Sequence, residues 1–288
     1  MDKVALVTGV SSGIGRSAAE LLRDAGYLVF GTTRSGKGAP DGIRAVQLDV
    51  RDPASVKAAV AAVAAHNGRI DVLVNNAGGA LTGAIEETSI AEAQALFDVN
   101  FFGAARVTDE VLPLMRAARS GRVVFVSSVV GFLPAPYMGY YAASKHALEA
   151  LAESQRHEFA RSGTPIKVSL IEPGEIATAI WDKADTSTDD IERQLDDAGR
   201  RRYGWLLDQA RGFIDEGREK GIPPSDVAAV VEQALTATKP KARYLVGRDA
   251  KLAGHLLTRL PDRLRDAANR LGSAAWEKRG RNLPDRPS

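Results

Sequence analysis

The sequence predicts an α/β fold, a doubly wound parallel sheet of about seven strands with helices on both faces. Short, continuously apolar runs alternate with longer stretches of helical periodicity. Such runs are typical of strands that are buried on both sides of a parallel sheet. Turns containing glycine join several of the runs to the helices that follow them. This pattern favours a single α/β domain over residues 1–250.

Seven apolar runs are the expected strands, at 4–7, 28–31, 45–48, 70–74, 123–126, 166–171 and 244–246. The helices expected between them span 16–24, 53–65, 89–118, 139–161 and 225–237. Residues 175–222 lack strand patterns and carry apolar residues at helical spacing, so we expect a helical insertion that covers the substrate site. Residues 251–288 are expected to form a helical, basic C-terminal extension. A solvated helix with a frayed end explains this extension, and a surface for membrane or nucleic acid is the alternative.

Composition excludes several classes of site and partner. The 288 residues carry a formal charge of +2, which gives no general attraction to nucleic acid. The chain has no cysteine and its four histidines lack the spacing of metal ligands, so no metal site is expected. The first residues leave no room for a signal peptide, and glycines and prolines interrupt the 22 uncharged residues before Lys145. We therefore expect a cytoplasmic protein without a transmembrane segment.

A tyrosine and a lysine four residues apart indicate a catalytic pair. If the residues between them are helical, Tyr141 and Lys145 project from one face about one turn apart. The ammonium should lower the pKa of the phenol, ordinarily about 10, and so make it a usable acid or base. Ser128 ends an apolar run and could hydrogen-bond the substrate oxygen that Tyr141 would protonate. Tyr140 is a weaker candidate because its neighbour four residues on is Ser144. For this pair alone, a buried helix with a snorkelling lysine is the alternative.

Glycines after the first expected strand predict a dinucleotide-binding loop. Residues 8–15 read Thr-Gly-Val-Ser-Ser-Gly-Ile-Gly and open a helix. In this setting backbone N–H groups can approach a pyrophosphate at the positive end of the helix. The spacing is one residue looser than Gly-x-Gly-x-x-Gly. The candidate loop residues are Gly9, Ser11, Ser12, Gly13, Ile14 and Gly15.

The end of the second expected strand favours NADP(H) over NAD(H). An acidic residue there would hydrogen-bond the 2′-hydroxyl of NAD. The sequence instead has Thr33, followed by Arg34. A guanidinium attracts a 2′-phosphate that no carboxylate repels. An arginine that faces solvent is the alternative interpretation of Arg34.

At these spacings, Ser128, Tyr141 and Lys145 resemble the catalytic residues of the short-chain dehydrogenase/reductase (SDR) family, and the glycine loop resembles its nucleotide loop. The resemblance covers roughly residues 3–178 and is strongest to the branch that includes 17-beta-hydroxysteroid and retinol dehydrogenases. It implies a Rossmann-type fold and a fourth catalytic residue, Asn100, which interrupts its helix. The cofactor-binding residues that it implies beyond the glycine loop and Arg34 are Asp49, Val50, Asn76, Ala77, Gly78, Tyr141, Lys145, Pro173, Gly174 and Thr178.

The same resemblance implies an oxidoreductase, for example a carbonyl reductase, that interconverts a ketone or aldehyde and an alcohol by hydride transfer, and Arg34 makes NADP(H) its expected cofactor. It also implies a homodimer or homotetramer packed through the helices 89–118 and 139–161. Apolar residues of the loop 129–138 and of the insertion suggest a bulky, steroid-, retinoid- or aromatic-ketone-like substrate, although core packing explains them equally well. Those of the insertion are Trp181, Trp205, Leu206 and Phe213. A non-catalytic NADP(H) sensor and an epimerase or dehydratase on the same scaffold are the alternatives.

Overall fold

Seven parallel strands form one sheet at the centre of the molecule. The computed structural model describes residues 3–178 and 180–283, so Asp285 and Arg286 of the basic extension lie outside the described residues. The strands are β1 Val4–Thr8, β2 Leu28–Thr33, β3 Arg44–Gln47, β4 Val72–Asn75, β5 Gly121–Val126, β6 Ile166–Pro173 and β7 Arg243–Val246. Their order is β3-β2-β1-β4-β5-β6-β7. The predicted fold class, a doubly wound Rossmann-type sheet, is confirmed.

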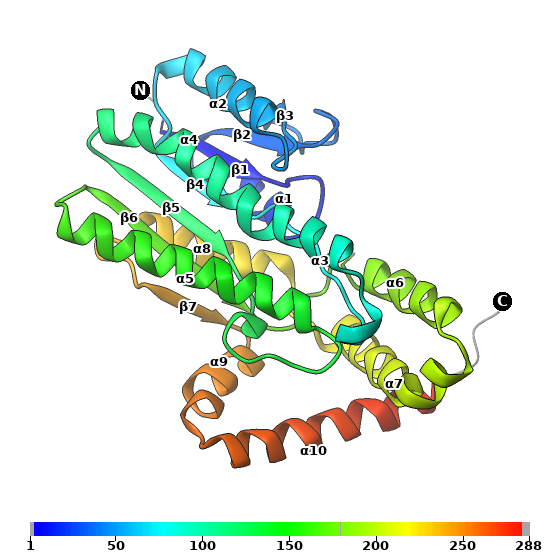
Figure 1. Ribbon diagram of the computed structural model, residues 1–288. Helices are drawn as coiled ribbons and strands as arrows, with labels where there is room; N and C mark the ends of the chain where they lie inside the picture. The colour runs from blue at the N-terminus through cyan, green and yellow to red at the C-terminus, as the bar shows by residue number, and fades with distance from the viewer. Residues whose placement is uncertain (1–2, 179, 284–288) are drawn as a thin grey trace.

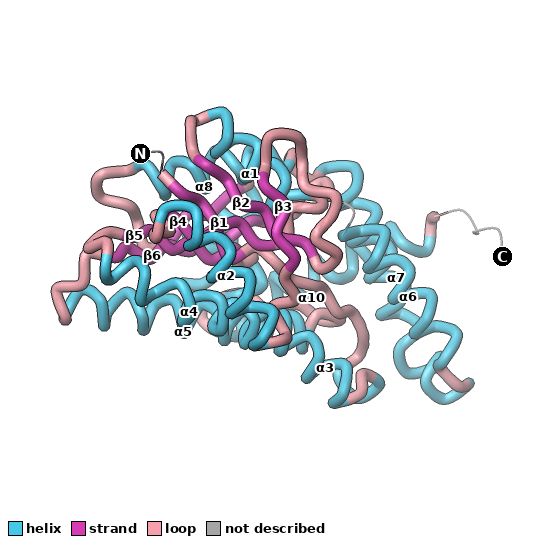
Figure 2. Tube along the Cα trace, turned by 90° about the horizontal axis from the view of Figure 1, so that it is seen from above, coloured by secondary structure: helices cyan, strands magenta, loops and turns pink. Residues whose placement is uncertain are grey.

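Helices cover both faces of this sheet (Figures 1 and 2). On one face lie α2 Pro53–Asn67, α4 Ala104–Ala117 and α5 Gly139–Arg161, and on the other lie α1 Gly13–Asp24 and α8 Pro224–Thr236. Successive strand residues point to opposite faces, so Leu6 packs with the first group of helices and Val7 with the second. Burial on both sides is the reason that the strands are continuously apolar.

The helix expected over 89–118 is divided in the structure. It consists of α3 Ile90–Phe97, a π-helical segment Asp98–Gly103 and α4. Ser89 begins α3 with a capping box, since its side chain accepts from the N–H of Glu92 and the Glu92 carboxylate accepts from the N–H of Ser89. A π-helical bulge inside a helix frequently marks a functional site, and here it contains Asn100.

The insertion and the C-terminal extension are helical and pack on each other. The insertion contains α6 Ile180–Gln194 and α7 Asp197–Lys220, and the extension contains α9 Arg248–His255 and α10 Asp262–Arg281. Gly280 of α10 lies so close to α7 that a Cβ atom there would overlap the carbonyl oxygen of Asp208. The indole N–H of Trp276 donates to Glu216 at 2.7 Å. The extension therefore packs along α7, although Gly280 is the only residue of α10 that is buried and the rest of that helix keeps contact with solvent. No helix of the described residues is long and apolar enough to cross a membrane.

Candidate active site

Glycines of the loop after β1 leave space that side chains would fill. Gly9 and Gly13 have positive φ angles of 74° and 61°, which favour glycine. A Cβ atom on Gly15 would overlap the carbonyl oxygen of Gly9 and a side chain of the turn after β4. Ser11 and Ser12 are exposed beside this space, where α1 begins and presents its first backbone N–H groups. This cradle fits a pyrophosphate, which binds close to backbone amides at a helix N-terminus.

The turn after β4 is tied to the glycine loop by hydrogen bonds. The Thr8 hydroxyl accepts from the backbone N–H groups of Asn76 and Ala77, both at 2.9 Å. The Asn76 amide donates to the carbonyl oxygens of Thr8 at 2.9 Å and of Gly9 at 3.0 Å. The Asn-Ala-Gly sequence therefore does more than form a bend, because it fixes the shape of the neighbouring glycine loop.

Ser128, Tyr141 and Lys145 are brought together at the carboxyl end of β5. Ser128 hydrogen-bonds Tyr141, which favours the phenolate, but burial outweighs this contact and raises the pKa of Tyr141 above its usual value. The Lys145 ammonium donates to the carbonyl oxygen of Val126 at 3.0 Å and lies 5.9 Å from the centre of the Tyr141 ring. Burial lowers the pKa of Lys145 to about 8, against the opposing effect of Glu149. The pKa of Tyr141 is therefore raised by burial, whereas we expected Lys145 to lower it.

Asn100 is held in place by three polar atoms of two residues, Gly79 and Ser144. Its carbonyl oxygen accepts from the N–H of Gly79 at 2.8 Å, and its amide donates to the Gly79 carbonyl and to the Ser144 hydroxyl, both at 3.0 Å. A Cβ atom on Gly78 would lie 3.1 Å from the Asn100 carbonyl oxygen and 3.8 Å from the Lys145 ammonium. Asn100 and Lys145 therefore flank the same glycine. The predicted interruption of the helix at Asn100 is present as the π-helical segment.

The residues predicted for the adenosine end of the cofactor lie beyond β2 and β3. Arg34 is exposed, and it is close enough to help to lower the pKa of Asp49. The main cause of that low pKa, about 2, is the hydrogen bond from Arg51, whose guanidinium donates to the Asp49 carboxylate at 2.6 Å. Val50 is buried against Gly103 of the π-helical segment. Sequence reasoning missed Arg51, although its position two residues after Asp49 was a usable signal.

A cavity of about 350 Å³ opens beside Ser128 and Tyr141. Of the predicted site residues, those that line it are Ile14, Ser128, Tyr141, Pro173, Gly174 and Thr178. The methyl group of Thr178 lies 3.3 Å from the position that a Cβ atom of Gly13 would occupy. The loop after β6 therefore meets the glycine loop at this cavity. Arg34, Asp49 and Val50 do not line the cavity and belong to a separate part of the site.

Three aromatic side chains form one wall of the cavity. Trp181, Phe213 and Trp276 line it and stack edge to face, with ring centres 5.2 Å and 4.9 Å apart. Trp181 and Phe213 were expected here. Trp205 and Leu206 were expected too, but Trp205 is 43% exposed and Leu206 packs in a separate apolar cluster. Trp276 was missed because it lies in the extension, about sixty residues beyond its aromatic neighbour.

The extension also holds the loop after β6. The Asp249 carboxylate, at the start of α9, accepts from the backbone N–H of Glu175 at 2.8 Å. A Cβ atom on Gly174 would overlap this carboxylate. Burial raises the pKa of Glu175 to about 7, helped by the nearby charges of Glu216 and Asp249. No motif in the sequence indicated Asp249 as a support of the site.

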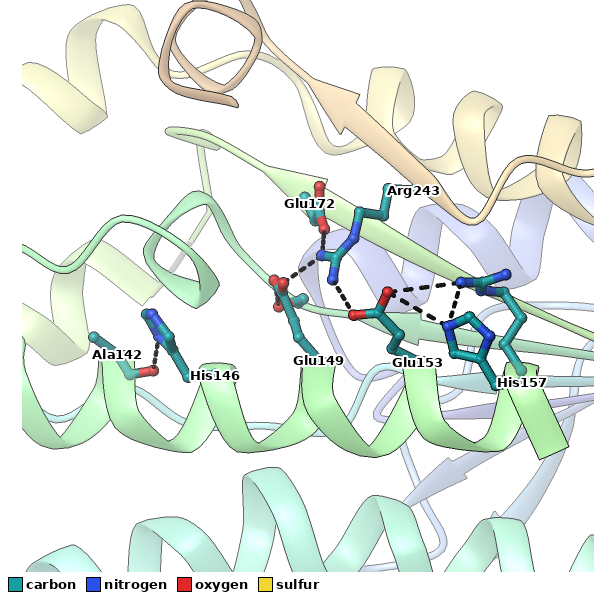
Figure 3. Close-up of polar contacts among 9 residues, drawn as sticks. Ala142, His146, Glu149, Glu153, His157, Glu172 and Arg243 are labelled. Atoms are coloured by element: carbon teal, nitrogen blue, oxygen red, sulfur yellow. Dashed lines mark hydrogen bonds and ion pairs between the residues drawn. The ribbon is translucent and has the colours of Figure 1, made fainter. Parts of the chain in front are cut away.

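A partly buried ion-pair network lies one helical turn beyond Lys145 (Figure 3). Glu149 accepts from the Ser127 hydroxyl at 2.7 Å and from Arg243 of β7 at 2.5 Å. Arg243 also donates to the buried Glu172 at 2.5 Å and to Glu153 at 3.2 Å. Burial and the charge of Glu149 raise the pKa of Glu172 to about 7. The network connects β6 and β7 to the residue before Ser128.

Comparison with known proteins agrees with this geometry. The family model for short chain dehydrogenase matches residues 3–189. A 3-ketodihydrosphingosine reductase of Bacteroides thetaiotaomicron is 33% identical over 85% of this chain and 88% of its own length. An NADPH-dependent 3-dehydrocapnine reductase of Ornithobacterium rhinotracheale is 34% identical over 92% and 95%. Human 17-beta-hydroxysteroid dehydrogenase type 1 is 36% identical over 84% of this chain and 76% of its own.

A solved structure extends the likeness to the whole chain. A short-chain dehydrogenase from Streptomyces avermitilis superimposes with a TM-score of 0.74 at 33% identity, covering 99% of both chains. The likeness therefore includes the insertion and the extension as well as the sheet. From the family model and the relatives together, the chain belongs to the short-chain dehydrogenase/reductase family of oxidoreductases.

Proposed function

We propose that this protein is an NADP(H)-dependent oxidoreductase that interconverts a bulky apolar ketone or aldehyde and the corresponding alcohol. One observation carries the proposal. Ser128 and Tyr141 line the same cavity as Thr178, which touches the glycine loop, so a substrate carbonyl and a nicotinamide would meet there. This place, outside the carboxyl ends of parallel strands, is where open α/β sheets bind their ligands.

The cofactor would be held by the glycine loop, the turn at 76–78, Lys145 and the loop at 173–178, and when bound it supplies the hydride. Tyr141 exchanges the proton with the substrate oxygen, because its phenol stays protonated in this buried position. Ser128 hydrogen-bonds the same oxygen and stabilises the negative charge that develops on it. Lys145 holds a positive charge beside Tyr141, and Asn100 orders the backbone next to Lys145.

Arg34 supports the preference for NADP(H). It is exposed just after β2, and Asp49, a carboxylate that its charge reaches, is bound by Arg51. Arg51 thus offsets the negative charge of Asp49, which would otherwise repel a 2′-phosphate near Arg34. One relative carries an NADPH dependence in its name, the 3-dehydrocapnine reductase.

The cavity wall supports the substrate class. Aromatic rings and aliphatic side chains predominate around the catalytic hydroxyls, and such a pocket favours a large apolar body with few polar groups. Relatives named for 3-ketodihydrosphingosine and for a 17-beta-hydroxysteroid are consistent with this class. We further propose a cytoplasmic homodimer or homotetramer packed through α5 and through α3, α4 and the π-helical segment between them, where Phe102 is 49% exposed.

The proposal is tested by measuring NADPH and NADH oxidation against ketones that range from small aromatics to steroids. We expect turnover that prefers NADPH and that Tyr141→Phe abolishes while NADPH binding persists. Tight NADPH binding with no turnover of any ketone would instead support the sensor alternative. Turnover that survives Tyr141→Phe would overturn the assigned role of the tyrosine.

A further inference from the structure

One guanidinium of β7 joins carboxylates of two other elements beside the candidate active site. The Nη1 atom of Arg243 donates to Glu149 of α5 and to Glu172 of β6, both at 2.5 Å (Figure 3). The side chains of Glu149 and Glu172 are 6% and 1% exposed, whereas that of Arg243 is 37% exposed. Arg243 is therefore a partly exposed cation that connects two buried anions.

The Glu149 end of this connection reaches both sides of Ser128. The Ser127 hydroxyl donates to the Glu149 carboxylate at 2.7 Å. A Cβ atom on Gly131 would overlap an oxygen of the same carboxylate, so Glu149 packs directly against this glycine. The N–H of Gly131 in turn donates to the carbonyl oxygen of Ser128 at 2.9 Å. Glu149 thus fixes the residue before Ser128 and contacts the turn that follows it.

The Glu172 end lies next to the loop that would hold the nicotinamide. Glu172 precedes Pro173, the last residue of β6, and both Pro173 and Gly174 line the cavity. The backbone of Glu172 pairs with Leu245 of β7, the strand that also carries Arg243. The bond from Arg243 to the Glu172 carboxylate therefore fixes the end of β6, from which this loop begins.

Stability alone is a weak reason for such an arrangement. Burying charged groups costs free energy that their mutual attraction often only balances, and well-packed apolar side chains frequently serve as well. Burial and the charge of Glu149 raise the pKa of Glu172 to about 7, which shows that this carboxylate is expensive to keep charged. A satisfied polar network instead rigidifies its members and specifies one arrangement of them. Here the members adjoin the two halves of the site.

We propose that Arg243 is a positioning residue that holds the Ser128 segment and the loop 173–178 in a fixed relative position, so that the substrate carbonyl meets the nicotinamide. Arg243 does not itself line the cavity. It acts on Ser128 through Glu149, and on the loop through Glu172. This inference rests on the proposed function and deepens it, because it assigns a further residue to the same reaction.

Kinetics of Arg243→Met test the effect on Ser128. The variant should lower kcat by about ten- to a hundredfold, because small displacements of catalytic groups cost this much. In a Ser128→Ala background the fall should be at least about threefold smaller, since residues that act through one group are coupled. A role confined to general stability predicts the same fall in both backgrounds, and that result would overturn the proposal.

Cofactor binding tests the effect on the loop and needs no turnover. By calorimetry, Arg243→Met should weaken NADPH binding by about fivefold, the worth of one ordinary hydrogen bond. Binding of adenosine 2′,5′-bisphosphate should not change, because this fragment lacks the nicotinamide. Unchanged affinity for NADPH, or an equal loss for both molecules, would contradict the connection between Arg243 and the loop.

Arg243→Lys and Glu153→Gln are the companion variants. Lysine keeps the positive charge but lacks the guanidinium fork, so kcat of Arg243→Lys should lie between the values of the wild type and Arg243→Met. This conservative variant also serves if Arg243→Met does not fold. Glu153 binds Arg243 but is 48% exposed, and Glu153→Gln should keep kcat within about twofold of the wild type.

The outcomes separate this inference from the proposed function. Tyr141-dependent turnover with the wild-type kcat in every folded Arg243 variant would overturn the positioning role and leave the proposed function intact. If the wild type turns over no ketone but Arg243→Met weakens the binding of NADPH alone, the connection to the loop is supported and the proposed reaction is overturned.

Discussion

Replacing Glu149 with glutamine should move the alkaline limit of activity to lower pH. Glu149 follows Lys145 by one turn of α5 and its charge raises the pKa of that lysine. Lys145 is buried, and burial alone favours its neutral form. Glu149→Gln keeps an acceptor for the Ser127 hydroxyl but removes the negative charge. The pKa of Lys145 should therefore fall, and a larger fraction of this lysine should be neutral at a given pH.

The expected size follows from the helix geometry. At the ~6 Å typical of side chains four residues apart, a carboxylate and an ammonium interact by about 3 kcal/mol at an effective dielectric constant of about 20. Arg243 binds the same carboxylate at 2.5 Å, and its positive charge offsets part of the interaction energy between Glu149 and Lys145. If about half of that interaction energy remains in the wild type, its loss in Glu149→Gln lowers the pKa of Lys145 by about one unit. The wild-type value is about 8. The protonated fraction near pH 8 then falls from about one half to about one tenth.

The assay is kcat for the reductase reaction from about pH 6 to about pH 9, the range over which such a group titrates. Because the protonated lysine is the active form, activity is lost as pH rises through the pKa, and the variant should lose it about one unit earlier. Selective ¹³C labelling of lysine would report the same shift by NMR. Glu153→Gln is the control, since Glu153 also binds Arg243 but is 48% exposed. If Glu149→Gln lowers the melting temperature while its pH profile superimposes on the wild type, the reasoning is refuted.

Three other substitutions test separate parts of the structure. Arg34→Ala should raise KM for NADPH by about thirtyfold, the worth of one charge-assisted contact, and equal effects on NADPH and NADH would refute the cofactor preference. Gly15→Ala should lower the melting temperature and weaken NADPH binding, because its Cβ overlaps the Gly9 carbonyl oxygen; unchanged binding would contradict the cradle. The pKa of Glu175 is raised to about 7, so its contribution to stability is present below its unfolded pKa and lost as pH rises toward 7. Glu175→Gln should therefore raise the melting temperature above pH 7 and hardly change it in acid, which thermal unfolding at two pH values would check.

The sheet could be predicted from the sequence because its signal is local. A parallel strand buried on both faces is continuously apolar, and the turn after it must contain residues that suit the ligand or the bend. The same holds for Tyr141 and Lys145, whose spacing places them on one face of α5 before any tertiary contact is known. The pKa of Tyr141 could not be read in this way. It depends on burial by segments remote in sequence, which outweighs its hydrogen bond to Ser128.

The C-terminal extension shows most clearly where local signals end. Its arginines predict a solvated helix, but two of them pair with acidic residues of α7: Arg279 with Asp215 at 2.6 Å and Arg281 with Asp208 at 3.5 Å. Charge complementarity between two helices has no local signature, because each helix alone is an ordinary charged helix. Gly280 then permits the close approach that brings Trp276 to the cavity. The extension therefore contributes to the wall of the cavity beside Ser128 and Tyr141, although it lies beyond the residues that the family model matches.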